Sequence, residues 1–334
     1  MTKPTIICIT PVKNEASILH RFLKCTSLWA DHIIIADQNS NDGSKEIALS
    51  YPKVTLIENS SKQFNEPERQ KMLIEAARKI PGLRLLIALD ADEMLTGNFQ
   101  ESPEWQTVLN ASPGTLIEFE WVNILPGFTS YWSPTNWYYP LGFMDDGSTH
   151  SGNIIHSPRV PEPIKAPKIR LQRIKILHYQ HINWERNKVK QRWYQCYERL
   201  NKPEKRLVNI YRMYHNMNAF PKHEIHFLPQ EWLSEYEKHG IDMTSLYLNT
   251  IYWQEQELLE WMSKYGTKRL KEIAIWDINW LEIAQKYQIY VDTDYQDPRN
   301  HLDKIIHYWL KQTQPIKHNL FVKVIDKLLT LIGW

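Results

Sequence analysis

The sequence predicts an α/β protein in which a mostly parallel sheet carries helices on both faces and is followed by a helical region. Short apolar runs recur through the first 90 residues, and a segment with helical spacing of apolar residues separates each run from the next. Strands that alternate with helices in this way are typical of a parallel sheet. From residue 185 onward, Trp and Leu recur at helical spacing, which predicts the helical region.

The expected elements follow one another in a regular order. The first apolar run stops at Pro11, and the second ends in residues 38–44, which are rich in turn-forming residues. In chain order, we expect strands over 5–10, 32–37, 54–57 and 85–89, and helices over about 14–23, 45–50 and 66–80. In the second half we expect helices over about 185–200, 230–239, 250–265, 268–287 and 315–334.

Polar residues follow three of the predicted strands. Asp90-Ala91-Asp92 comes directly after the apolar run 85–89, and the other two strands end near Asn14 and at Asp37. Ligands collect at the carboxyl ends of parallel strands, and carboxylates there suit a hard divalent cation. A single Asp-x-Asp is more often a solvated turn, but three such strand ends together predict a site for a nucleotide with a metal-bound diphosphate.

These three segments resemble the signatures of a known family. Residues 10–15, 37–43 and 90–92 are similar, in this order and spacing, to the motifs of glycosyltransferase family 2. The resemblance covers about the first 95 residues and fades through about residue 185. It implies the GT-A fold, which has a Rossmann-like sheet, and transfer of a sugar from a nucleotide-diphosphate sugar with inversion at the anomeric carbon.

The resemblance also implies roles for individual residues. Asp37 is expected to accept a hydrogen bond from the base, which suits uracil and so favours UDP without excluding guanine or thymine. Asp92 is expected to bind Mn²⁺ or Mg²⁺ directly, with Asp90 in the ribose or metal shell. The other implied contacts to the nucleotide sugar are Thr10, Pro11, Asn14, Glu15, Asn39, Arg69 and Ala91. Turn capping is the alternative for Asp37 and Asn39, and a solvated helix face is the alternative for Arg69.

Two further roles have to come from the segments after residue 95. His178 lies near a strand end and is a candidate third metal ligand, the alternative being a structural hydrogen bond. Inverting transfer needs a general base, and we expect Asp146, or else Asp145, to be that base. Two adjacent carboxylates repel each other, which can raise the pKa of one of them. The alternative is a turn closed by Gly147.

Aromatic residues concentrate in residues 121–139, among Pro, Gly, Ser and Asn. Aromatic faces pack against sugar rings, so this loop-like stretch is a candidate platform for a glycan or lipid-linked acceptor. The residues proposed to bind the acceptor are Trp132, Trp137 and Tyr138. The alternative is a small apolar cluster beneath a long loop.

Length and composition bound the organisation of the chain. The 334 residues exceed one typical core, and we expect a catalytic domain over 1–184 and a helical region over 185–334. Within the first domain, residues 1–95 form the nucleotide and metal half and residues 96–184 the acceptor half. The net charge of +2 gives no reason to expect a nucleic-acid partner.

The expected location is the cytoplasm. The three cysteines are few and far apart, no apolar leader precedes the first strand, and no apolar run approaches the ~20 residues of a membrane span. The last helix, 315–334, places apolar residues on one face beside lysines. It could lie at the inner face of the membrane, dock on the helical region, or join two subunits in a homo-oligomer. The basic helix 185–200 could touch an anionic ligand or be a solvated face.

Two other classes of protein stay open. A sugar-phosphate nucleotidyltransferase can share the sheet and the metal-binding Asp, but such enzymes usually carry a glycine-rich loop after the first strand, and residues 11–15 contain no glycine. A non-catalytic glycan-binding or scaffold protein is the other alternative, and the intact Asp90-Ala91-Asp92 motif argues against it.

Overall fold

The chain forms two units that interleave in sequence. In the computed structural model, residues 3–61, 64–246, 251–289 and 294–334 are described. The first unit consists of Met1–Ile182 with His226–Leu248, and the second of Asn183–Ile225 with Asn249–Trp334. None of the helices in the described part of the chain is long and apolar enough to cross a membrane.

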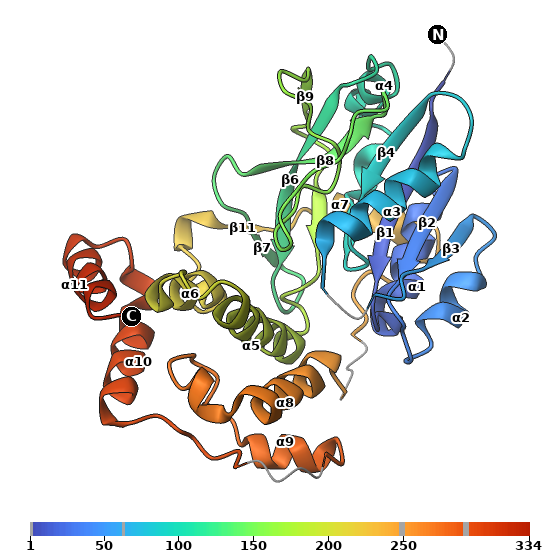
Figure 1. The fold of residues 1–334 in the computed structure, drawn as a ribbon. Helices are drawn as coiled ribbons and strands as arrows, with labels where there is room; N and C mark the ends of the chain where they lie inside the picture. The colour runs from blue at the N-terminus through green and yellow to red at the C-terminus, as the bar shows by residue number, and fades with distance from the viewer. Residues whose placement is uncertain (1–2, 62–63, 247–250, 290–293) are drawn as a thin grey trace. The chain divides into compact units, whose positions relative to one another are not determined.

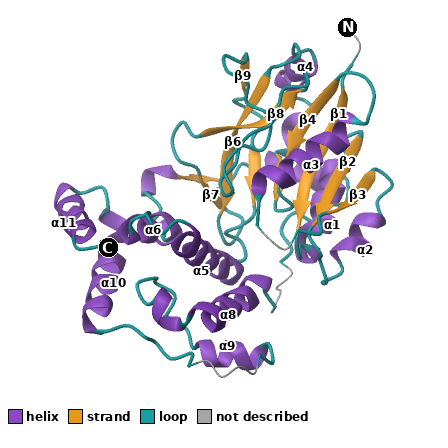
Figure 2. Cartoon of the chain, in the orientation of Figure 1, coloured by secondary structure: helices purple, strands orange, loops and turns teal. Residues whose placement is uncertain are grey.

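The first unit holds the sheet (Figures 1 and 2). Its strands are β1 (Thr5–Val12), β2 (His32–Asp37), β3 (Val54–Glu58), β4 (Arg84–Ala88), β5 (Glu93–Leu95), β6 (Leu116–Ile124), β7 (Ser130–Trp132), β8 (Tyr138–Met144), β9 (Lys168–Arg170) and β10 (Ile176–His178). Its helices are α1 (Ala16–Ser27), α2 (Ser44–Leu49), α3 (Glu66–Arg78), the 3₁₀ turn η1 (Gly97–Phe99), α4 (Pro103–Leu109) and α7 (Glu231–Lys238). The short strand β11 (Ile225–Phe227) lies where the chain passes from the second unit to the first: Ile225 is assigned to the second unit and the next two residues to the first.

The sheet has a parallel half and an antiparallel extension. Its main path runs β7-β6-β8-β4-β1-β2-β3, and the four strands from β4 to β3 are parallel, as the sequence predicts. Strand β8 is antiparallel to both β4 and β6. The register pairs Val12 with Asp37 and Ile9 with Ala88, so the carboxyl ends of β1, β2 and β4 meet at one edge. We call this the carboxyl edge.

Helices cover both faces of the parallel half. Side chains alternate along a strand, so Ile6 and Cys8 face one way and Ile7 and Ile9 the other. The first pair is buried in one apolar cluster with α1, and the second pair in another cluster with α3. Figure 1 shows α3 lying across one face of the sheet. Burial on both faces explains why these strands read as unbroken apolar runs.

The second unit is helical. Its helices are α5 (Trp184–Asn201), α6 (Leu207–Tyr214), α8 (Trp253–Tyr265), α9 (Trp280–Lys286), α10 (His301–Thr313) and α11 (Leu320–Leu331), with 3₁₀ turns η2 (Asn216–Asn218), η3 (Lys222–Glu224), η4 (Thr267–Leu270) and η5 (Gln314–Ile316). The prediction of a single helix over 268–287 is wrong, because this segment forms η4 and α9 with a non-helical stretch between them. The indole N–H of Trp276 donates to Leu270 O and that of Trp280 to Ile275 O, and Asn279 caps the new helix start of α9. These bonds hold the backbone between η4 and α9 out of helical geometry.

Residues 226–248 differ from the expected domain organisation. The first boundary, after Ile182, lies close to the expected one at 184, but helix α7 belongs to the first unit. Trp232, Leu233 and Tyr236 are buried in the same apolar cluster as α1, and the Tyr236 hydroxyl donates to Leu95 O. An amphipathic helix carries no sequence signal of which core it joins, so the pattern alone assigned it to the helical region.

Candidate functional site at the carboxyl edge

Two loops meet at the carboxyl edge and are bonded to each other. The Asn14 N–H donates to Ser40 Oγ, and the Asn41 N–H donates to Asn14 Oδ1, both at 2.9 Å. Asn14 and Asn39 have φ angles of 57° and 52°, in the left-handed region that asparagine tolerates better than most residues. The loop after β1 and the loop after β2 therefore form one fixed surface. Of the residues predicted to contact the nucleotide sugar, Asn14, Glu15 and Asn39 lie in these loops, whereas Thr10 and Pro11 lie within β1, and Thr10 is fully buried.

Asp37 ends β2 within this surface and is 1% exposed. Its Oδ2 accepts a hydrogen bond from the Ser40 N–H at 3.0 Å and lies 3.6 Å from Lys45 Nζ. Its Oδ1 is buried and has no hydrogen-bond partner among the described residues. Buried acceptors are nearly always satisfied, so this oxygen is suited to receive an N–H donor from a ligand.

Arg69 lines a cavity of about 260 Å³ next to Asp37. The cavity is bounded by Glu58, which pairs with Asp37 across β2 and β3, and by Asn59, whose N–H donates to Asp37 O at 2.8 Å. The Arg69 guanidinium lies over the Phe64 ring, 5.7 Å from its centroid, and its Nε is buried without a hydrogen-bond partner in the described structure. Arg69 is thus half-buried and lines this cavity beside the carboxyl edge, and its contact with the donor stays a prediction.

Asp90 is held by an arginine. The Nη2 of Arg159 lies 2.8 Å from Asp90 Oδ2, and its Nη1 is ion-paired with Glu93. The Glu93 carboxylate also accepts the Asp90 N–H at 2.9 Å, and the guanidinium lies 5.5 Å from the centroid of the Trp121 ring. Asp90 therefore contacts a protein cation in this structure, while the neighbouring Ala91 is buried in the apolar core.

Glu93 is fully buried, and this burial changes the pKa of its carboxyl group. Burial raises the pKa of Glu93 to about 7, and the Arg159 guanidinium opposes this rise. Nearby carboxylates raise the pKa of Arg159 above its already high value. Arg159 thus places a permanent positive charge between Asp90 and Glu93.

Asp92 faces His178 across the same edge. Its Oδ2 lies 3.8 Å from His178 Nε2, and both residues are buried. The His178 Nδ1 lies 2.8 Å from Asn123 Oδ1, so the ring donates from Nδ1, and its Nε2 is turned toward Asp92. The His178 ring stacks on Trp121 with centroids 4.3 Å apart, which fixes its plane.

This pair of atoms fits a divalent cation. Atoms that bind one ion at about 2.0–2.2 Å lie no more than about 4.4 Å apart, and the Asp92 and His178 atoms meet this limit. A carboxylate and a neutral imidazole suit Mn²⁺ better than Mg²⁺. No group of three or more His, Cys, Asp or Glu side chains placed to hold a metal occurs among the described residues. Further ligands would have to come from water or a substrate.

The aromatic stretch is part strand and part loop, because residues 125–129 and 133–137 connect β6, β7 and β8, and Trp137 lies in the second connection. Trp121 packs edge-on against Tyr139 at 5.1 Å, and Tyr139 lies 5.5 Å from Trp137, which is 46% exposed. Tyr138 faces the other way, with its hydroxyl bonded to Gln172. Trp132 lies on β7, with its ring 6.2 Å from that of His181. Of the three proposed acceptor residues, Trp137 is connected to the acids through ring contacts.

The expected general base is not at this edge, and we correct that expectation. The register pairs Met144 with Leu85, so Asp145 follows at the amino end of β4, opposite to Asp90. Its carboxylate is ion-paired with Arg78 at 2.8 Å and with Arg84 at 3.0 Å. These arginines hold the pKa of Asp145 below its ordinary value against the effect of burial. Asp146 is exposed and accepts the Ser148 N–H in a turn.

Three contacts at this edge do not follow from the motifs: Glu93 and Arg159 on Asp90, and Asn123 on His178. Arg159 is 69 positions from Asp90, and Asn123 is 55 positions from His178, so no local pattern connects either pair. For Arg159, the one available signal was an arginine between two prolines after a histidine-rich segment.

The fold and the carboxyl edge together define the class of protein. It is an α/β protein in which buried acids and a histidine lie at one end of the sheet. Residues 7–101 match the model of glycosyl transferase family 2, which confirms over this part of the chain the resemblance drawn from the motifs. A search of curated proteins finds no match.

Two solved structures illustrate the wider likeness. One is the crystal structure of GalNAc-T7 with UDP, GalNAc and Mn²⁺, at 12% identity and a TM-score of 0.37, where the alignment covers 79% of this chain and 58% of that one. The other is 4-diphosphocytidyl-2C-methyl-D-erythritol synthase, at 12% identity and a TM-score of 0.28, covering 43% of this chain and 76% of that one. Similarities of this size carry no argument about function.

Proposed function

We propose that this protein is a metal-dependent glycosyltransferase that uses a nucleotide-diphosphate sugar, with UDP as the favoured nucleotide. The observation that carries the proposal is the meeting of Asp37, Asp92 and His178 at one edge of a parallel sheet whose sequence matches glycosyl transferase family 2. The acceptor would be a glycan or a lipid-linked sugar, and inversion at the anomeric carbon follows from the family resemblance.

Each end of the donor has a candidate partner. The orphaned Oδ1 of Asp37 would accept an N–H of the base, and Arg69, in the cavity beside it, would add a positive charge. Asp92 and His178 would hold Mn²⁺ or Mg²⁺, which stabilises negative charge on a leaving diphosphate. Arg159 is a second cation at this edge, and it keeps Asp90 and Glu93 oriented. Trp137 is the best placed residue for a sugar of the acceptor.

A thermal-shift panel tests the donor proposal. Because only two protein side chains would ligate the ion, we expect Mn²⁺ alone or UDP alone to raise the melting temperature little, and the two together to raise it by several degrees. The panel compares UDP-, GDP-, dTDP- and CMP-sugars, each with Mn²⁺, with Mg²⁺ and with a chelator. Equal shifts for all nucleotides with the chelator present would contradict a metal-bound diphosphate.

Product-release and glycan-binding assays separate this activity from the alternatives. Release of pyrophosphate from a nucleoside triphosphate and a sugar phosphate would favour a nucleotidyltransferase. Glycan binding without any affinity for nucleotide diphosphates would favour a non-catalytic protein. Release of the nucleoside diphosphate from the sugar donor that gives the largest shift supports the transferase.

We also propose that α11 contacts an anionic membrane surface, at the inner face of the membrane for a cytoplasmic protein. Of its twelve residues only Val322 is buried, and its exposed apolar side chains are Leu320, Phe321, Val324, Leu328 and Leu331. Lys323 and Lys327 lie on the same helix, which suits negatively charged lipid headgroups.

Vesicle sedimentation tests this contact. We expect the protein to sediment with vesicles that contain phosphatidylserine and not with pure phosphatidylcholine, and the variant Phe321→Ser, Leu328→Ser to stay in the supernatant. The double variant should keep its melting temperature, because both side chains are exposed. A concentration-dependent dimer in the absence of vesicles, abolished by the same variant, would instead assign this face to a second copy of the chain.

A further inference from the structure

A large cavity lies inside the helical unit, apart from the residues of the carboxyl edge. Its volume is about 740 Å³, and every residue that lines it belongs to the second unit. Its walls come from α5, the end of α6, residues 274–277, and α10 with the residues that flank it. Cavities that bind small molecules usually have volumes of about 300–1,000 Å³, so this one is of the right size.

The charge of the lining is strongly one-sided. Five permanent cations line the cavity, and the single lining carboxylate is Asp277. The cations are Lys188, Arg192, Arg299, Lys304 and Lys311. Two carboxylates outside the lining also pair with them: Glu185 with Lys188, and Asp297 with both Arg299 and Lys304. Within the described structure these carboxylates leave an excess of two positive charges.

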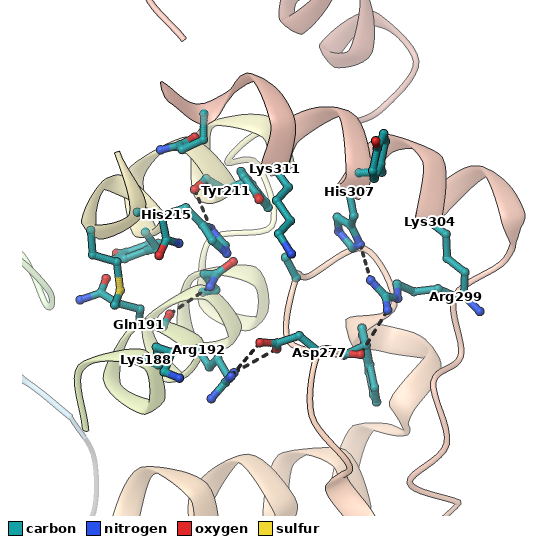
Figure 3. Close-up of a pocket in the computed structure, with 18 of the residues that line it drawn as sticks. Lys188, Gln191, Arg192, Tyr211, His215, Asp277, Arg299, Lys304, His307 and Lys311 are labelled. Carbon is teal, nitrogen blue, oxygen red and sulfur yellow. Dashed lines mark hydrogen bonds and ion pairs between the residues drawn. The ribbon is translucent and has the colours of Figure 1, made fainter. Parts of the chain in front are cut away.

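Two of the cations lie where a ligand could reach them. Arg192 is 8% exposed and is bonded to Asp277 through Nε and Nη2, at 3.2 and 2.8 Å, so its Nη1 is not used by that pair. Lys311 has no ion pair among the described residues. In Figure 3 its side chain extends from α10 into the space between His215 and His307. A cavity wall of low dielectric concentrates the field of such charges.

The two histidines are neutral and fix their neighbours. Burial lowers the pKa of both His215 and His307 to about 4. The Nε2 of His307 lies 3.0 Å from Glu272 O and its Nδ1 3.1 Å from Arg299 Nη1, so the ring donates to the carbonyl and accepts from the guanidinium. His215 stacks on Tyr211 with centroids 3.8 Å apart and donates from Nδ1 to Tyr211 O. Its Nε2 therefore carries a lone pair that can accept a ligand hydroxyl.

We propose that this cavity binds a small phosphate ester, with the phosphate held by Arg192 and Lys311 and the sugar or nucleoside part against the imidazole and tyrosine side chains. A phosphate ester carries about −1.5 to −2 charges at pH 7, which matches the excess of two positive charges. A single carboxylate carries half of that charge. The concave shape and the size favour a small molecule over a nucleic acid or a protein surface. The site is separate from the proposed donor site and does not depend on it.

Titration calorimetry of the full chain tests the proposal. The probes are glucose 1-phosphate, UDP and inorganic pyrophosphate, with glucuronic acid as a carboxylate of similar size. All titrations contain a chelator, so that metal-dependent binding at the carboxyl edge does not contribute. We expect binding of at least one phosphate probe, weaker or absent binding of glucuronic acid, and a loss of about tenfold in affinity for Lys311→Gln. The preferred probe distinguishes a sugar phosphate from a nucleotide.

Two control variants locate the binding. Lys323→Gln removes a lysine of the same unit that does not line the cavity, and its affinity should equal that of the wild type. Asp92→Asn alters the proposed donor site, and it should also leave this binding unchanged. Lys311 is exposed and unpaired in the described structure, so its substitution should not unfold the protein, which a melting curve checks. No binding of any phosphate probe at millimolar concentration, equal binding of glucuronic acid, or unchanged affinity in Lys311→Gln would each overturn the proposal.

Discussion

Replacement of Asp92 by asparagine is expected to lower sugar transfer and donor hydrolysis by about a thousandfold or more. Asparagine keeps the size of the side chain but removes the negative charge that would hold the cation beside His178. Metal ions supply several kcal/mol to charge stabilisation in such reactions, and each ~1.4 kcal/mol corresponds to a factor of ten in rate. Initial rates with the donor identified by the thermal-shift panel measure the effect.

Melting temperatures with and without UDP and Mn²⁺ distinguish the loss of metal binding from a folding defect. Asp92 is 5% exposed, and the Tyr179 N–H donates to its backbone oxygen, a bond that the substitution leaves in place. The variant should therefore unfold within a few degrees of the wild type while losing the joint stabilisation by UDP and Mn²⁺. Asp146→Asn, an exposed turn aspartate of the same unit, is the matched control and should keep full activity. If Asp92→Asn retained transfer that still depended on metal, Asp92 would not be a metal ligand.

Replacement of Asp145 by asparagine is expected to lower the free energy of unfolding by about 2–4 kcal/mol, without affecting donor binding. The substitution leaves Arg78 and Arg84 without their buried counter-ion, and breaking a buried pair from one side is costly. The two arginine side chains are 26% and 18% exposed, so water offsets part of that cost. Urea unfolding of the wild type and the variant measures the difference.

The difference should depend on pH in one direction. The arginines hold the pKa of Asp145 in the folded protein below its ordinary value, so the folded state favours the charged carboxylate. This contribution is fully present above about pH 4 and is lost as the pH falls through the folded pKa. The gap between wild type and Asp145→Asn should therefore shrink as the pH is lowered from 7 toward 3. A variant that kept its stability at pH 7 but lost transfer would restore Asp145 as the general base.

The parallel half of the sheet could be predicted because its information is local. Strands buried on both faces read as apolar runs, and the acid after each run follows from the same short stretch of sequence. Asp37, Asp90 and Asp92 could therefore be assigned to one edge without knowing the structure. His178 was also placed near a strand end, although its orientation depends on Asn123 and Trp121, which lie more than 50 positions away.

The rest of the site could not be predicted because it depends on strand direction and on distant pairs. Asp145 follows an apolar strand just as Asp90 does, yet β8 runs antiparallel to β4, so the same pattern delivers it to the opposite end of the sheet. Nothing in residues 138–146 indicates that direction. Likewise, side chains alternate along β8, so Tyr138 is bonded to Gln172 while Tyr139 faces the other way and packs against Trp121, on which His178 stacks.

The placement of α7 affects how the protein can be made and divided. The chain leaves the first unit after Ile182 and returns for His226–Leu248 before the second unit is complete. During synthesis, about 140 further residues have to be made before Tyr236 can pack into the core around Leu95 and Phe99. An expressed fragment that stops near residue 184 would contain every strand-end acid and still expose that apolar surface. A minimal catalytic fragment of this protein must therefore include α7, either in its natural place or joined to residue 182 by a linker that replaces residues 183–225.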